Sequence, residues 1–330
     1  MTKQRNLFLD YFRGIAIIIV VLGHALLLCD ETATDPLLRL IQTFQMSLLF
    51  VISGFSSGFS EPMKNSKSFL LGKVKRILLP YLVWIQIHYL LTACVSGYYS
   101  VVKQLKSVLV SQFWFLRILF LMFLVYWAFV MLYRALHKLS SGPLKVLIAA
   151  VVAAILTVLI SRIPGCGSLL NYLPFFVLGN LLYKLSKKYD AKVYRSAFTI
   201  LAGILAVVFV VSIVLLSKTQ GIIYILIDKS MALSGVAACY IVCRLLYAIP
   251  WLKKLTTLVE KIGKNTLPVY AIHWCIFFSL PLPLYSVLVN SIGLHLSALI
   301  VALVWLVLCM VMIYLLQKNK FTRNLLLGEK

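Results

Sequence analysis

The sequence predicts an all-α, polytopic membrane protein with about ten transmembrane helices and both termini in the cytoplasm. Of its 330 residues, 62% are hydrophobic, and the mean hydropathy is +0.99, well above the values of an ordinary soluble domain. The chain contains about ten apolar runs long enough to cross the hydrocarbon core, which needs roughly 20 residues. Short polar segments separate these runs, so we expect one membrane domain over residues 1–330.

The expected spans begin near the N-terminus and end at residue 316, followed by a short basic cytoplasmic tail over residues 317–330. They cover residues 7–29, 37–60, 77–97, 112–134, 146–161, 168–184, 197–216, 221–247, 265–289 and 295–316. The first span is not a signal peptide, because its apolar stretch is long, contains Arg13 and has no small-residue cleavage site. We expect no further domain after the last span.

The distribution of basic residues predicts the orientation, because Lys and Arg in short loops are retained on the cytoplasmic side. When the spans alternate, most of the 32 basic residues fall on the same side as the N-terminus. The opposite segments hold only Lys103, Lys106, Arg162 and Lys218, and they include the acidic stretch DETATD. This distribution predicts that both termini lie in the cytoplasm, and therefore that the number of spans is even.

The formal net charge of +23 does not indicate nucleic-acid binding, because the aromatic residues sit in and beside the spans rather than among exposed basic residues. Topology and attraction to the anionic headgroups of membrane lipids account for the charge. The seven cysteines lack the spacing of a zinc site and read as small apolar fillers, and no metal is expected.

The stretch LDYFRGIAIIIVVLGHALLL, residues 9–28, places Asp10, Arg13 and His24 on one face of a helix. Arg13 and His24 are eleven residues apart, about 1100° of rotation, which is about 20° beyond three full turns. Asp10 could neutralise Arg13 near the inner end, and His24 would lie about 16 Å further out. Such residues usually face a protein interior or a watery cavity. Alternatively, Arg13 snorkels to the surface and His24 simply bonds to a neighbouring helix.

The pattern as a whole resembles the acyltransferase-3 family of integral-membrane acyltransferases. This family includes bacterial O-acetyltransferases that act on lipopolysaccharide, peptidoglycan, exopolysaccharides and Nod factors. The most specific motif is LDYFRGIAIIIVVLGHA, and the others follow in the family's order: FQMSLLFVISGF (44–55), KVKRILLPYLVW (73–84), FWFLRILFLMF (113–123), YLPFFVLGNLL (172–182) and NTLPVYAIHWCIFF (265–278). The fourth span reads WFLR where one large branch has an acidic element, so the chain more closely resembles the standalone sugar O-acetyltransferases.

The resemblance implies transfer of an acyl group, expected to be acetyl, from cytoplasmic acyl-CoA to a hydroxyl of a cell-surface or lipid-linked carbohydrate. It implies a multi-pass protein of the bacterial cytoplasmic membrane, with acetyl-CoA as donor substrate and no bound cofactor. The phosphates of the donor require inward-facing cations. Lys73 and Arg76, one turn apart, fit this need, although topology alone also places basic residues there. The family commonly has two arginines, so the register among Lys73, Lys75 and Arg76 is open.

Histidine is suited to removing the proton of an acceptor hydroxyl, and His24 is the candidate general base or transient acyl acceptor. Arg13 would orient the donor or stabilise developing negative charge. His273 is a candidate donor contact or a packing residue, and its depth in the ninth span predicts that it does not sit beside His24. Arg117 and Trp114, near the outer end of the fourth span, are candidate substrate-binding residues, and Arg117 is equally suited to snorkelling.

A transporter or flippase whose polar helix face lines a permeation path is the alternative function. Matching Gly or Pro breaks in inverted repeats would favour it, and the sequence shows no convincing internal repeat. His88, Asp228 and Lys229 are weaker polar candidates.

Overall fold

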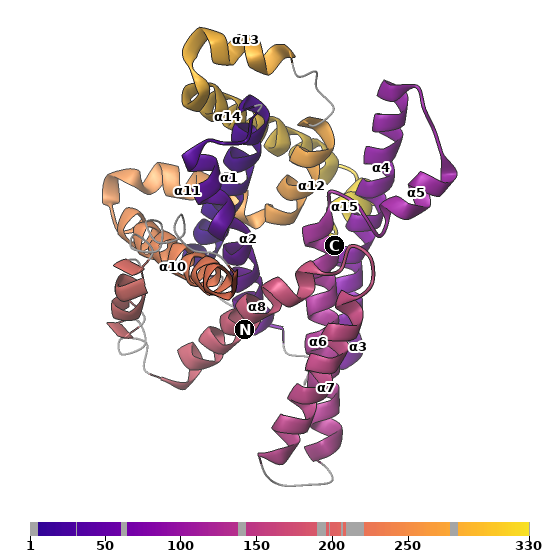
Figure 1. The fold of residues 1–330 in the computed structure, drawn as a ribbon, viewed down its shortest axis with the longest axis vertical. Helices are drawn as coiled ribbons and strands as arrows, with labels where there is room; N and C mark the ends of the chain where they lie inside the picture. The colour runs from indigo at the N-terminus through magenta and orange to yellow at the C-terminus, as the bar shows by residue number, and fades with distance from the viewer. Residues whose placement is uncertain are drawn as a thin grey trace.

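The computed structural model describes residues 6–30, 32–60, 65–137, 143–189, 196–197, 199–205, 207–208, 221–277 and 283–329. Every regular element assigned within these ranges is helical, which confirms the all-α prediction (Figure 1). The first half of the chain forms α1 (Leu7–Cys29), α2 (Pro36–Ser57), α3 (Ser66–Lys73), a π-helical turn (Val74–Leu78), α4 (Leu79–Ser96), α5 (Val101–Ser107), α6 (Trp114–His137) and α7 (Leu144–Ser161). The second half forms α8 (Ser168–Lys188), α10 (Gly221–Tyr247), a 3₁₀ turn (Pro250–Leu252), α11 (Lys253–Lys264), α12 (Thr266–Phe277), α13 (Pro283–Ile292), α14 (Leu294–Gln317) and α15 (Lys320–Leu326).

Within the described ranges, seven helical stretches are long and apolar enough to cross a membrane. They are Leu7–Cys29, Pro36–Ser57, Ser66–Ser96, Trp114–His137, Leu144–Ser161, Ile227–Tyr247 and Leu294–Gln317. The expected span over 197–216 lies mostly outside the described residues. The structure therefore agrees with a polytopic membrane protein, whereas the count of ten spans and the side of the termini stay predictions.

Two expected spans do not match the bounds of the described helices. The expected span over 265–289 corresponds to two described elements, α12 up to Phe277 and α13 from Pro283, and residues 278–282 between them lie outside the described residues. The expected span over 77–97 begins too late, since the continuous helical stretch starts at Ser66.

A π-helical turn interrupts the long helix formed by α3 and α4. In this turn the N–H of Leu79 bonds to the carbonyl of Val74, five residues earlier. Pro80 follows directly and has no N–H to donate to the carbonyl of Arg76, so the usual α-helical register is lost at this point. Lys75 and Arg76 therefore lie within an irregular turn of the helix.

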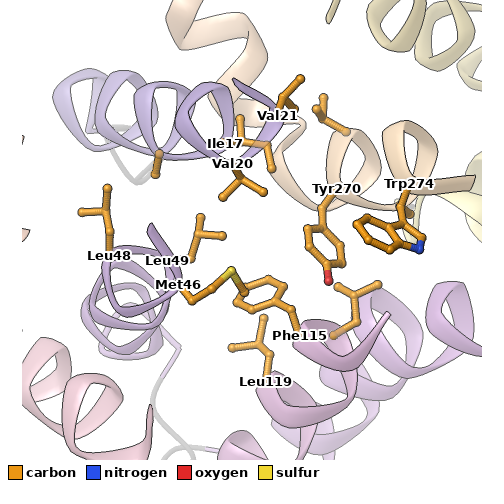
Figure 2. Packing of buried hydrophobic residues seen from close by; sticks show 14 of the residues in the cluster. Ile17, Val20, Val21, Met46, Leu48, Leu49, Phe115, Leu119, Tyr270 and Trp274 are labelled. Carbon is orange, nitrogen blue, oxygen red and sulfur yellow. The ribbon is translucent and has the colours of Figure 1, made fainter. Parts of the chain in front are cut away.

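Helix α1 lies at the centre of the packing and contacts α2, α11, α12 and α14. Figure 2 shows the buried core beside it, with Val20 of α1, Leu49 of α2, Phe115 of α6 and Tyr270 of α12 around one apolar cluster. These side chains are at most 2% exposed. The first span is therefore surrounded by protein, and polar groups on it face other helices.

Large apolar side chains stay exposed along α7 and α14, including Leu147, Leu159, Leu303 and Val307. A soluble monomer rarely exposes such a continuous apolar surface. In a membrane these apolar faces contact lipid chains and not water. Both helices are therefore suited to the periphery of a membrane bundle.

Candidate active site

Helices α1 and α11 cross at two glycines, Gly14 and Gly263. A Cβ added to Gly263 would lie 1.8 Å from the carbonyl oxygen of Asp10, and one added to Gly14 would lie 2.1 Å from that of Val259. No larger residue fits at either position unless a helix moves. The contact therefore fixes the position of α11 along the axis of α1. Only Asn265 separates α11 from α12, so the position of α12 is fixed as well.

Above this crossing, His24 of α1 meets His273 of α12. Nδ1 of His24 lies 3.1 Å from Nε2 of His273, and Nδ1 of His273 lies 2.9 Å from the carbonyl oxygen of Val269. A carbonyl only accepts, so a neutral His273 carries its proton on Nδ1 and accepts at Nε2. We infer that His24 donates from Nδ1 and keeps its basic lone pair on Nε2.

Aromatic side chains fix both imidazole rings. The edge of Trp274 packs against His24 with 4.7 Å between ring centroids, and Tyr270 packs against His273 at 5.7 Å. His273 is completely buried, whereas His24 is half-buried. The pair is thus rigid on the α12 side, and His24 is the more accessible partner.

The prediction that His273 does not sit beside His24 is wrong. It assumed that the ninth span begins level with the first, but the glycine crossing places residue 263 beside residue 14. His24 lies ten residues beyond Gly14, about 15 Å of helical rise along α1, and His273 lies ten residues beyond Gly263, past the junction of α11 and α12. The equal spacing of ten residues can be read from the sequence. Its relevance depends on the contact between Gly14 and Gly263, which the sequence does not reveal.

Arg13 lies lower on α1 and is held by two neighbours. Its guanidinium donates to Asp10 Oδ1 at 3.3 Å, as the sequence predicts, and to Ser56 Oγ of α2 at 2.5 Å. Asp10 is only 2% exposed, so it compensates the arginine in a desolvated position. Sequence reasoning missed Ser56, which carries no distinguishing local pattern.

A cavity of about 700 Å³ lies where α3 meets α4, at the same end of the bundle as Arg13. We call it the basic cavity, because four cationic side chains line it: Lys73, Lys75, Arg76 and Lys320. Lys73 also stacks on Phe123, with 3.7 Å from Nζ to the ring centroid. The structure thus brings the predicted Lys73 and Arg76 together around one space, while His273 is not among its lining residues.

The C-terminal segment closes one side of the basic cavity. The indole N–H of Trp84 donates to the carbonyl of Leu326 at 2.9 Å, and Leu327 is buried. Gly328 adopts φ +65° with its Cα against the backbone of Arg76, an arrangement that favours glycine. Sequence reasoning treated this segment as a basic tail, because its docking depends on contacts more than 200 residues apart.

Arg117 and Trp114 lie away from the basic cavity, at the start of α6. Arg117 is 8% exposed and donates to the carbonyl of Gly165 at 2.7 Å and to the hydroxyl of Tyr81 at 3.3 Å. It therefore ties α6 to α4 and to the segment before α8, and it does not snorkel. Trp114 stacks on Tyr172 with 5.6 Å between centroids and is half-buried. Neither residue contacts the histidine pair directly in the described interactions.

The site thus combines a hydrogen-bonded histidine pair, in which His273 is buried and His24 half-buried, with a separate basic cavity in a bundle of apolar helices. The chain belongs to the acyltransferase-3 family, since the family model described as "Acyltransferase domain" matches residues 6–316. Family membership supports an acyltransferase rather than a transporter.

Two curated relatives are similar to this chain, and both are named Nodulation protein NolL. The protein from Mesorhizobium japonicum is 24% identical over 302 residues, which covers 84% of this chain and 78% of the relative. The protein from Sinorhizobium fredii is 30% identical over 192 residues, which covers 54% of this chain and 49% of the relative. No solved structure gives a significant match.

Proposed function

We propose that this protein is an O-acyltransferase that moves an acyl group, expected to be acetyl, from acyl-CoA to a hydroxyl of a cell-surface or lipid-linked carbohydrate. The observation that carries the proposal is the His24–His273 pair, whose hydrogen bonds engage Nδ1 of His24 and thereby support a basic lone pair on its Nε2. A neutral imidazole held in one tautomer is the arrangement that general-base catalysis requires.

The basic cavity is the proposed donor site. Its volume of about 700 Å³ lies within the usual range for small-molecule sites, roughly 300–1,000 Å³. Lys73, Arg76 and Lys320 would bind the phosphates of CoA, since ammonium and guanidinium groups form strong charge-assisted hydrogen bonds to phosphate. The positive-inside rule supports a cytoplasmic position for this end of a bacterial membrane protein, where acyl-CoA is available.

The path between donor site and base would follow one face of α1. Arg13 is near enough to Lys73 to repel its ammonium group, and His24 lies about 16 Å further along the helix. The long pantetheine arm of CoA separates its phosphates from its thioester, so the thioester would extend past Arg13 toward His24. Arg13 is thereby assigned to orienting the donor.

In the proposed reaction, Nε2 of His24 takes the proton of the acceptor hydroxyl as its oxygen attacks the thioester carbonyl. The carbon–sulfur bond breaks, and the departing CoA thiolate receives the proton from His24. His273 acts as a positioning residue that holds the His24 ring in the required tautomer. In the alternative route, Nε2 first accepts the acyl group and then passes it to the hydroxyl.

The test compares the cell-envelope glycans of a deletion strain complemented with the wild-type gene or with His24→Ala. Mass spectrometry should find one acyl substituent that disappears in the deletion strain, returns with the wild-type gene and stays absent with His24→Ala. Equal membrane levels of the two proteins serve as the control. Identical glycan acylation in all strains would contradict the proposal.

A further inference from the structure

A second cavity of about 270 Å³ lies between α4 and the segment that connects α5 to α6. We call it the α4–α5 cavity, and both helices stand together at one side of the molecule in Figure 1. The polar residues that line it come from both walls: His88, Tyr89, Thr92, Lys103, Lys106, Ser107, Ser111 and Gln112.

Hydrogen bonds hold the two walls of this cavity together. Gln104 of α5 donates from Nε2 to Oε1 of Gln86 of α4 at 2.6 Å. The Tyr89 hydroxyl donates to the carbonyl of Ser100 at 2.7 Å and accepts from its N–H at 2.9 Å. The short helix α5 is therefore fixed against α4, and the cavity is preformed.

Two polar atoms in the wall lack a protein partner. Nδ1 of His88 and Oγ of Ser111 are shielded from solvent and have no hydrogen-bond partner among the described residues. Leaving a buried polar atom without a partner destabilises a protein. The His88 ring is fixed by the edge of Phe113, with 5.7 Å between centroids. A ligand with hydroxyl groups would satisfy both atoms, since each can donate or accept.

The charge of the lining residues adds a second requirement. Lys103 and Lys106 contribute two ammonium groups, and no acidic side chain is among the residues that line the cavity. A volume of 270 Å³ corresponds to about nine waters at about 30 Å³ each, which is room for a single sugar ring. The cavity thus suits one hydroxyl-rich unit that carries a negative charge.

The α4–α5 cavity borders the helix that carries His273. Gln112 lines the cavity, and its carbonyl accepts a hydrogen bond from the Tyr270 hydroxyl at 3.4 Å. The Tyr270 ring packs against His273, which bonds to His24. A ligand in this cavity is therefore separated from the histidine pair by one layer of side chains.

We propose that the α4–α5 cavity binds an acidic sugar unit of the acceptor, one that bears a carboxylate or a phosphate. Lys103 and Lys106 bind the anionic group, and His88 and Ser111 bind ring hydroxyls. A neighbouring sugar of the same glycan then presents its hydroxyl to His24. This assignment rests on the proposed O-acyltransferase function and adds the charge class of the acceptor.

The test measures probe binding to the full-length protein in nanodiscs of zwitterionic phosphatidylcholine, by saturation-transfer-difference NMR. The probes are D-glucuronate, glucose 1-phosphate and D-glucose, so that the arms separate carboxylate from phosphate and both from a neutral ring. We expect at least one anionic probe to bind at least fivefold more tightly than D-glucose. A Lys103→Gln/Lys106→Gln double variant should lose this preference, whereas Arg162→Gln, which removes an exposed cation outside the cavity, should keep it.

A separate arm measures CoA release from acetyl-CoA by the wild type and by His24→Ala, and it tests the proposed function alone. Equal binding of D-glucose and both anionic probes overturns the charge assignment, whatever CoA release shows. Equal probe binding by the wild type and the double variant, or no binding of any probe, also overturns it. A Ser111→Val variant with unchanged thermal stability should weaken every probe severalfold, and unchanged binding would contradict the cavity assignment.

Discussion

The substitution His273→Phe tests the positioning role of this residue most sharply. Phenylalanine keeps a ring of similar size between Tyr270 and Trp274 but removes the acceptor for Nδ1–H of His24. Losing the partner of a buried polar group costs about 1–3 kcal/mol. If this free energy is lost from the conformation in which His24 reacts, the activation barrier rises by the same amount. At 1.36 kcal/mol per factor of ten, kcat should then decrease about 5- to 150-fold.

The assay measures CoA release from acetyl-CoA by purified protein, with kcat and KM determined separately. KM for acetyl-CoA should stay within about twofold, because His273 does not line the basic cavity. His273→Gln should recover part of kcat, since its amide oxygen can accept the hydrogen bond from His24. His137→Phe serves as the matched control, because His137 is exposed at the end of α6 and pairs with Lys145.

Two results would refute this reasoning. An unchanged kcat in His273→Phe would mean that the ring orientation of His24 does not depend on this hydrogen bond. A raised KM with an unchanged kcat would instead assign His273 to donor binding, one of the two roles that the sequence leaves open. A thermal melt of each variant shows whether the fold is intact. It thereby separates a loss of folded protein from a loss of the His24 orientation.

Three further predictions concern other parts of the molecule. Lys320→Ala should raise KM for acetyl-CoA severalfold without changing kcat, whereas Lys318→Ala, a cation outside the basic cavity, should leave both constants unchanged; steady-state kinetics decide. Gly263→Ala should destabilise the protein by about 1–3 kcal/mol, as overpacking does, because its Cβ would lie 1.8 Å from a carbonyl oxygen of α1; a lowered midpoint in thermal unfolding checks this. A hydrogen bond from the Thr32 hydroxyl, together with backbone N–H groups, lowers the pKa of Asp30 below its usual value. The ionised Asp30 side chain therefore stabilises the folded protein fully above about pH 4, and this stabilisation declines as pH falls through the lowered pKa. Asp30→Asn should abolish that part of the pH dependence in thermal melts between pH 3 and 7.

Relations within one helix could be predicted from the sequence. Asp10 and Arg13 are three residues apart, so helical geometry alone brings them together, and the structure contains this ion pair. The position of Lys73 and Arg76 on one helical turn follows in the same way. Their common cavity confirms that they are neighbours, and their role toward CoA stays a prediction.

Relations between helices could not be predicted, because they depend on where two helices touch. The depth of His273 relative to His24 is set by the contact of Gly14 with α11, and hydropathy gives no information about that contact. Lys320 lies at the basic cavity in a C-terminal segment that is held by long-range contacts, among them the bond from Trp84 to the carbonyl of Leu326. Neither contact leaves a periodic pattern in the sequence.

The most direct test of the central claim is acyl transfer by the purified protein in nanodiscs, supplied with radiolabelled acetyl-CoA and an extract of lipid-linked and cell-surface glycans. We expect label to move to the glycan fraction, to be released by mild alkali as expected for an ester, and to be absent with His24→Ala. Label transfer by His24→Ala at the wild-type rate would rule out His24 as the catalytic base or acyl acceptor.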